Sequence, residues 1–187
     1  MIKKVPDYIN LPIEKHAFGA FLPEKISYLL VGTFPGKQFT QLKEGEVWLD
    51  ELAWSYGGRN QFWKIMEEIY DVKLISRKDK QLLFSRLDIG MMDLIQSCSR
   101  KDDNNLDNNL VNITWNQNAF EKIFEEKEIK KIFCTGKGVA IILKKWFPTM
   151  ATQIIALPSP SPRYANLSFD EKKAIYEKEL PSIQEMR

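Results

Sequence analysis

The chain has 187 residues, 44% of them hydrophobic and 12% aromatic, which indicates one globular domain over residues 1–187 and excludes a disordered chain. No apolar run approaches the roughly 18 residues of a membrane helix, and the N-terminus lacks the apolar stretch of a secretory signal, so we expect a cytoplasmic protein that does not contact membranes. Cys98 and Cys134 are the two cysteines and form no C-x-x-C pair. We therefore expect reduced cysteines, no metal site or iron–sulfur cluster, and no cofactor.

Positive charge is unevenly distributed, although the net charge at pH 7 is only +2. The segment 129–169 has no acidic residue and six basic ones: Lys130, Lys131, Lys137, Lys144, Lys145 and Arg163. A chance bias of composition is one interpretation. The other is that this segment faces a polyanion, because Lys and Arg neutralise the phosphates that dominate affinity for nucleic acids.

The apolar pattern predicts alternating strands and helices. A short apolar run that ends at a glycine predicts a strand at 26–32. Helices are predicted at 60–70, 77–87, 118–130, 137–147 and 168–180, and further strands at 90–98, 131–136 and 152–158. Ser168 and Glu171 form a capping-box pattern at the last helix. Short apolar strands between helices predict an α/β fold, a three-layer α/β/α sandwich around a central, mainly parallel four-stranded sheet.

Two loops with unusual sequences follow predicted strands, at the edge where parallel sheets bind ligands. The first, "GTFPG" (residues 32–36), lacks both the G-K-[ST] of a phosphate-binding loop and the G-x-G-x-x-G of a dinucleotide site. Its glycines would let a ligand approach the backbone, but a tight turn is the alternative interpretation. The second, "PSPSPRY" (residues 158–164), has prolines that restrict the backbone and predict a rigid, projecting segment. Its serines could donate to phosphate, and Arg163 and Tyr164 add a charge and a flat ring at the tip; a stiff connection to the last helix is the alternative.

Other polar residues are ambiguous. Asn60 is a good cap for the helix that follows it, and its amide could also hold a water or a base edge. His16 is the only histidine and lies far from both loops in the sequence, so no histidine-based triad or multi-histidine metal site is expected. Asp88 and Asp93 have the spacing of ordinary loop and strand-end carboxylates.

Four motifs in order resemble the uracil-DNA glycosylase superfamily: "LLVGTFPG", "YGGRNQFWKIMEEIY", "IFCTGKGVA" and "ALPSPSPRYAN". The likeness is greatest to its hypoxanthine-DNA glycosylase and mismatch-specific branches, and it spans residues 26–166. It implies a three-layer α/β/α fold and base flipping, followed by hydrolysis of the N-glycosidic bond of a damaged base.

The resemblance also implies roles for individual residues. "GTFPG" is similar to the water-activating loop, although one branch has an Asn where this chain has Phe34. In the hypoxanthine branch the catalytic amide comes from the "N-x-F-W" asparagine, which is Asn60 here. The implied base pocket comprises Gly32, Thr33, Phe34, Pro35, Gly36, Trp54 and Tyr56. The implied DNA contacts are Ser159, Ser161, Arg163, Tyr164 and Lys137. The tip at Arg163 and Tyr164 would insert into the base stack at the position that the flipped base has left.

The predicted function is that of a DNA glycosylase in base-excision repair that removes uracil or hypoxanthine. The expected partner is DNA that contains a damaged or mismatched base. No lysine is positioned by a motif as a nucleophile, so we expect a monofunctional enzyme, and we expect a monomer. Two alternatives stay open: a catalytically inactive glycosylase-like protein that binds DNA lesions, and a nucleoside- or nucleotide-binding protein on the same scaffold.

Overall fold

The computed structural model describes residues 8–41, 54–57 and 59–183. Its centre is a parallel sheet with strand order β3-β2-β6-β7. The strands are β2 (Tyr28–Gly32), β3 (Ile89–Asp93), β6 (Lys131–Cys134) and β7 (Ile154–Ala156). Their carboxyl ends are aligned, because Gly32 pairs with Asp93 and Cys134 pairs with both Val31 and Ala156. The predicted α/β fold with a four-stranded parallel sheet is confirmed.

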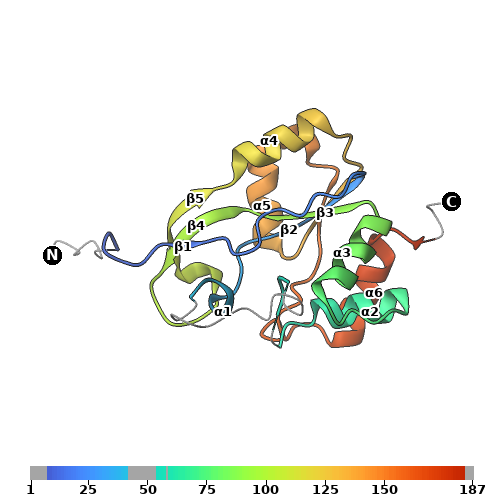
Figure 1. Ribbon diagram of the computed structural model, residues 1–187, viewed down its shortest axis with the longest axis horizontal. Coiled ribbons are helices and arrows are strands. Elements are labelled where there is room, and N and C mark those ends of the chain that lie inside the picture. The colour runs from blue at the N-terminus through green and yellow to red at the C-terminus, as the bar shows by residue number, and fades with distance from the viewer. Residues whose placement is uncertain (1–7, 42–53, 58, 184–187) are drawn as a thin grey trace.

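Helices cover both faces of this sheet (Figure 1). On one face lie α4 (Gln117–Glu126) and α5 (Lys137–Trp146), and on the other lie α2 (Phe62–Tyr70), α3 (Arg77–Arg86) and α6 (Phe169–Glu179). Successive β2 residues point to opposite faces, so Leu29 and Val31 join the α4–α5 core while Leu30 joins the α2–α3–α6 core. This double burial explains why the strands read as continuous apolar runs.

A second, antiparallel sheet was not predicted. It comprises β1 (Glu14–Lys15), β4 (Ile95–Arg100) and β5 (Leu110–Trp115), in the order β1-β4-β5. The predicted strand at 90–98 is divided between the two sheets: β3 ends at Asp93, and β4 begins only two residues later. β4 is mostly polar, and its pairing with β5 is irregular, with register shifts at Ser97. β5 alternates apolar and polar residues from Val111 to Trp115, a strand signal that the sequence prediction missed.

The predicted helices are present with small changes at their ends, and the capping box of α6 is confirmed. Ser168 Oγ accepts from the backbone N–H of Glu171, and Glu171 accepts from the backbone N–H of Ser168. Three short helices were missed: α1 (Lys37–Thr40), η1 (Asp107–Asn109) and η2 (Pro148–Met150). Within the described ranges, no helix combines the length and the apolar character needed to span a membrane.

Candidate functional site

The loop after β2 is held by a buried ion pair. Arg100 donates to the carbonyl oxygen of Pro35 at 2.7 Å, and its Nε lies 3.0 Å from Glu14 Oε2. Both side chains are almost fully buried, and the guanidinium also lies 5.7 Å from the centre of the Phe34 ring. Residues from β1 and β4 thus fix the backbone of the predicted water-activating loop.

Behind this loop, Gly32 forms a crowded contact with Asp93 and Tyr56. A Cβ atom on Gly32 would lie 2.4 Å from Asp93 Oδ1 and 2.8 Å from the Tyr56 hydroxyl, so only glycine fits there. The hydroxyl also lies 3.3 Å from Thr135 Oγ1, at the end of β6. Burial and the negative charge of Asp93 raise the pKa of Tyr56 well above its usual value, so the phenol stays protonated and can donate.

His16 and Asp93 form a pair that the sequence did not reveal. His16 Nε2 lies 2.9 Å from Asp93 Oδ2, while Nδ1 accepts from the backbone N–H of Gly19 at 2.9 Å. Because Nδ1 accepts, the ring proton is on Nε2 and is donated to Asp93. The ring also contacts Phe34 edge-on, with centroids 5.9 Å apart. His16 is far from the loops in the sequence but not in space, because β1 runs back along β4 and carries it to this edge.

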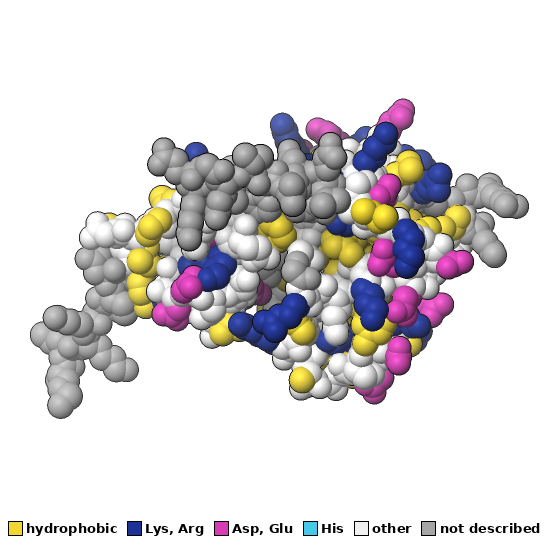
Figure 2. Space-filling model, turned by 60° about the horizontal axis from the view of Figure 1, so that its bottom comes forward, with side chains coloured by type: hydrophobic (Ala, Val, Ile, Leu, Met, Phe, Trp, Pro, Cys, Tyr) yellow, Lys and Arg dark blue, Asp and Glu magenta, His cyan; other side chains and the backbone are white. Residues whose placement is uncertain are grey.

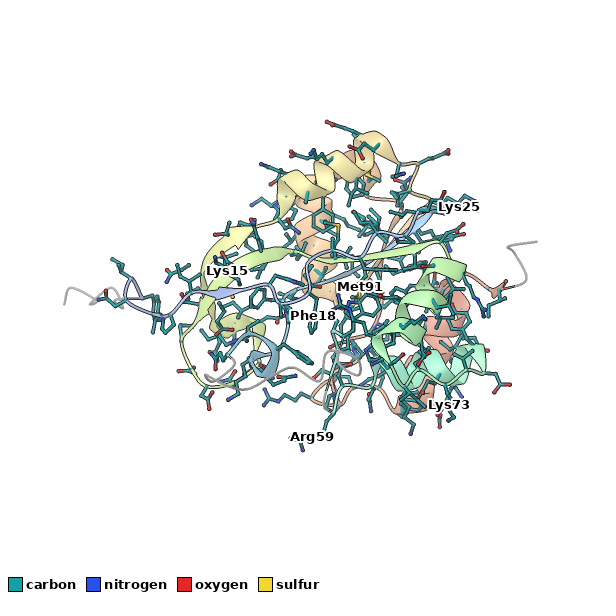
Figure 3. All side chains as sticks on the ribbon, viewed as in Figure 1. Lys15, Phe18, Lys25, Arg59, Lys73 and Met91 are labelled. Carbon is teal, nitrogen blue, oxygen red and sulfur yellow. The ribbon has the colours of Figure 1, made fainter. Side chains whose placement is uncertain are left out.

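Asn60 bonds to the first turn of α2, in agreement with the first of its two interpretations, although the N-cap residue itself is Gln61. Its Oδ1 accepts from the backbone N–H of Phe62 at 2.9 Å, and the side chain is partly exposed. A carbonyl oxygen has two lone pairs, so capping leaves one acceptor position and the amide N–H groups for a ligand. Its neighbour Arg59 is exposed, and Figure 3 shows Arg59 at the lower edge of the protein, outside the packed core.

The proline-rich segment is held in place by helices α2 and α6. The carbonyl oxygen of Pro160 accepts from the backbone N–H of Gln61 at 2.9 Å, and that of Pro158 accepts from the Tyr176 hydroxyl at 2.9 Å. Pro160 is buried, whereas Pro162 and Arg163 at the tip are exposed. The prediction of a projecting segment is thus wrong for its first half: these carbonyls anchor it to the protein, and only the tip projects.

Lys172 of α6 lies beneath this segment. Its Nζ donates to Gln61 Oε1 at 2.9 Å and to the carbonyl oxygen of Ser161 at 3.1 Å, and it lies 5.6 Å from the centre of the Tyr164 ring. The side chain is only 1% exposed, and burial lowers the pKa of its ammonium. The lysine therefore ties the start of α2 to the DNA-contact loop implied by the resemblance.

The two serines of this segment bond to the local backbone. Ser159 Oγ accepts from the N–H of Ser161, and Ser161 Oγ accepts from the N–H of Arg163, both at 3.3 Å. Each hydroxyl keeps its own proton for donation, so both can still bond a phosphate oxygen. Lys137 is exposed at the first turn of α5, just after the carboxyl end of β6.

Two sequence expectations need correction here. Trp54 is 1% exposed and stacks on Trp63 with centroids 5.4 Å apart, so it is a core residue and its ring is not open to a base. The acid-free segment does not form one basic face: Lys130 and Lys131 lie at the amino end of β6, and Lys144 and Lys145 lie in the last turn of α5. Asp88 agrees with its interpretation as an ordinary carboxylate: it is buried at the amino end of β3, pairs with Lys25 and lies at the opposite edge from Asp93.

The face that carries these loops is hollowed near its middle, with Lys and Arg side chains on both sides of the hollow (Figure 2). Two other surface cavities lie elsewhere, one beside α4 and η2 and one between α2 and α6. No group of three or more His, Cys, Asp or Glu residues among the described positions could hold a metal ion. Burial raises the pKa of the Cys98 thiol to about 11 and that of Cys134 to about 12, so both remain thiols at neutral pH.

No protein-family model matches the sequence, and no curated protein matches it. Among solved structures, it is similar to a candidate uracil DNA glycosylase from Methanosarcina acetivorans, determined by NMR in solution. The two share 19% identity with a TM-score of 0.58, over 89% of this chain and 98% of the other. The chain has a uracil-DNA glycosylase-like fold. The two loops described above extend from the carboxyl edge of this glycosylase-like sheet.

Proposed function

We propose that the protein is a DNA glycosylase that flips a deaminated base, uracil or hypoxanthine, out of DNA and hydrolyses its N-glycosidic bond. The observation that carries the proposal is the direct link between the two functional segments. The Gln61–Pro160 hydrogen bond and the Lys172 contacts join the Asn60 helix start to the proline-rich loop. A loop that grips the DNA backbone would therefore set the position of the sugar relative to the Asn60 amide.

The base pocket would form between the loop at 33–36 and the side chains of Asp93 and Tyr56, which both lie against Gly32. Asp93 Oδ2 is occupied by His16, which leaves Oδ1, near Gly32 and the Tyr56 hydroxyl, as the acceptor for a base N–H. Uracil and hypoxanthine both carry such an N–H beside a carbonyl, and the Tyr56 hydroxyl can donate to that carbonyl. This pairing of one acceptor with one donor suits a deaminated base better than cytosine or adenine, whose ring nitrogen at that position lacks hydrogen.

Catalysis would proceed through departure of the base and an oxocarbenium-like sugar. The C1′–N bond breaks with its electron pair going to the base, and water adds to C1′. Asn60 orients that water through its free amide positions, and DNA phosphates held by the protein stabilise the cation. Ser159, Ser161, Arg163 and Lys137 would hold those phosphates, with Tyr164 beside the vacated position in the base stack.

A monofunctional reaction is the simpler proposal. A lyase needs an amine that attacks the sugar carbon, and Lys172 is a lysine of lowered pKa at this edge. However, its Nζ is bonded to two acceptors beneath Tyr164 and is almost wholly buried. Borohydride should therefore trap no covalent complex between the protein and lesion DNA.

The deciding experiment is a panel of duplex and single-stranded oligonucleotides that carry uracil, hypoxanthine or an unmodified base. Alkaline strand cleavage after incubation should reveal an abasic site for at least one lesion and none for unmodified DNA. Tight, lesion-selective binding without cleavage would instead identify a lesion-binding protein. Indifference to DNA, with affinity for free nucleosides, would identify a nucleoside-binding protein on this scaffold.

A further inference from the structure

Water that attacks a sugar must lose a proton, and the residues described so far do not take it. The amide of Asn60 can orient water but has no basicity at neutral pH. The loop at 32–36 contains no carboxylate. Asp93 is 6% exposed and already bonded to His16, so it is poorly placed to meet bulk water.

A carboxylate reaches this loop from another part of the chain. Asp107, in the short helix η1, accepts a hydrogen bond on Oδ2 from Thr33 Oγ1 at 2.9 Å. The side chain is exposed, so water can reach it. Among the described residues no bond occupies Oδ1, the second oxygen, which leaves it available as an acceptor.

The segment around Asp107 is docked on the start of α1, so the carboxylate is held in place before any ligand binds. Asn105 Oδ1 accepts from the backbone N–H of Lys37 at 2.7 Å, and its Nδ2 lies 3.2 Å from Gln38 Oε1. The Lys37 ammonium pairs with Asp103, so its charge is directed to that carboxylate. This docking brings a residue 74 positions from Thr33 in the sequence to the end of β2.

The surroundings of Asp107 also suit a base. Partial burial raises the pKa of its carboxyl most strongly, and the negative charge of Asp93 raises it further. The Thr33 hydroxyl and the Arg100 guanidinium act in the opposite direction. Water reaches the side chain, but the surrounding protein excludes part of the solvent. Desolvation and the charge of Asp93 therefore outweigh Thr33 and Arg100, and the pKa of Asp107 is raised. A carboxylate of raised pKa is a stronger base.

We propose that Asp107 is a catalytic residue, the general base that accepts a proton from the attacking water. The inference rests on the proposed glycosylase function. As the water oxygen bonds to C1′, one water proton passes to the Asp107 carboxylate, and the electron pair of the broken C1′–N bond leaves with the base. The proton then passes to the released base or to solvent. Asn60 orients the water and Asp107 deprotonates it, because the loop at 32–36 has no carboxylate that could accept the proton.

The test is single-turnover base release as a function of pH by wild type, Asp107→Asn and Asp102→Asn. Wild-type release should fall as pH decreases through the raised pKa of Asp107, because a protonated carboxyl cannot accept a proton. Asp107→Asn keeps the shape of the side chain and an acceptor for Thr33, and should be about 100-fold slower with no such acidic limb. Asp102→Asn removes an exposed carboxylate from the same segment and should behave as wild type.

Thr33→Val gives a second readout that does not depend on the folding of Asp107→Asn. It removes the hydroxyl that stabilises the ionised carboxylate, so the acidic limb should move to higher pH. If wild type releases a base but Asp107→Asn matches its rate and pH profile, the inference is wrong and the proposed function stands. If wild type releases no base from any lesion, the proposed function itself fails.

Discussion

Lys172 Nζ lies 2.9 Å from Gln61 Oε1 and 3.1 Å from the carbonyl oxygen of Ser161, so one buried ammonium joins α6, the start of α2 and the proline-rich loop. The prolines stiffen the loop, but this contact decides where the stiff loop lies. A rigid loop anchored beside Asn60 would lose less conformational entropy when it binds a DNA strand than a free loop would.

Replacement of Lys172 by methionine should therefore weaken both the fold and DNA binding. Two partly buried acceptors would lose their partner, and the penalty of about 1–3 kcal/mol for a buried unsatisfied group is an upper limit for each. We expect a lower melting temperature in thermal denaturation and a higher Kd in fluorescence anisotropy with lesion DNA. Lys173→Met is the matched control, because Lys173 makes an exposed ion pair with Glu68 at 3.1 Å, and exposed ion pairs contribute little to stability. Equal effects of the two variants would contradict the anchoring role.

Asn60→Ala should abolish most turnover while DNA binding is retained. Loss of a catalytic donor lowers rates by about 100-fold or more, and loss of the cap costs about 0.5–2 kcal/mol of stability. Single-turnover release and thermal denaturation measure the two effects separately. Ser76→Ala is the control for the cap alone, since Ser76 Oγ accepts from the backbone N–H of Asp79 at α3, away from this edge. Turnover at the wild-type rate in Asn60→Ala would show that another group orients the water.

Arg163→Ala should weaken DNA binding and reduce its dependence on salt. A protein that neutralises one phosphate fewer has a slope of log K against log salt that is smaller by about 0.9. Ser159→Ala should lower affinity with less effect on the slope, because a neutral hydroxyl displaces no counterion by charge. Arg86→Ala is the control, as Arg86 is exposed in the last turn of α3. An unchanged slope for Arg163→Ala would argue against a phosphate contact.

Gly32→Ala should impair base release far more than it impairs folding. The new methyl group would displace Asp93 Oδ1 and the Tyr56 hydroxyl, the two groups proposed to read the base. Overpacking of this kind costs about 1–3 kcal/mol. Gly138→Ala is a control with the opposite expected effect on stability. A Cβ there meets no atom within 4 Å, and alanine should stabilise α5 by about 0.5–1 kcal/mol. Wild-type release by Gly32→Ala would rule out a tight pocket at that position.

The sequence alone determined the strands and helices of the central layers, because their signal is local. β2 and β6 are buried on both faces and read as apolar runs, and the capping box of α6 is carried by two residues three positions apart. The placement of the two loops at one edge followed as well, since parallel strands present their carboxyl ends together. The side-chain bond of Asn60 at the start of α2 was also predicted from its local motif, whereas its role as a site residue stays a prediction.

The tertiary structure alone decided which distant side chains meet at that edge. His16 and Asp93 are 77 positions apart, Thr33 and Asp107 are 74 apart, and Gln61 and Lys172 are 111 apart. The first two contacts depend on the paths of β1, η1 and the irregularly paired β4 and β5, and the third depends on how α6 packs against the start of α2. Periodicity predicts the face that a residue presents within its own element, whereas the meeting of two elements depends on packing and buried charge across the whole fold.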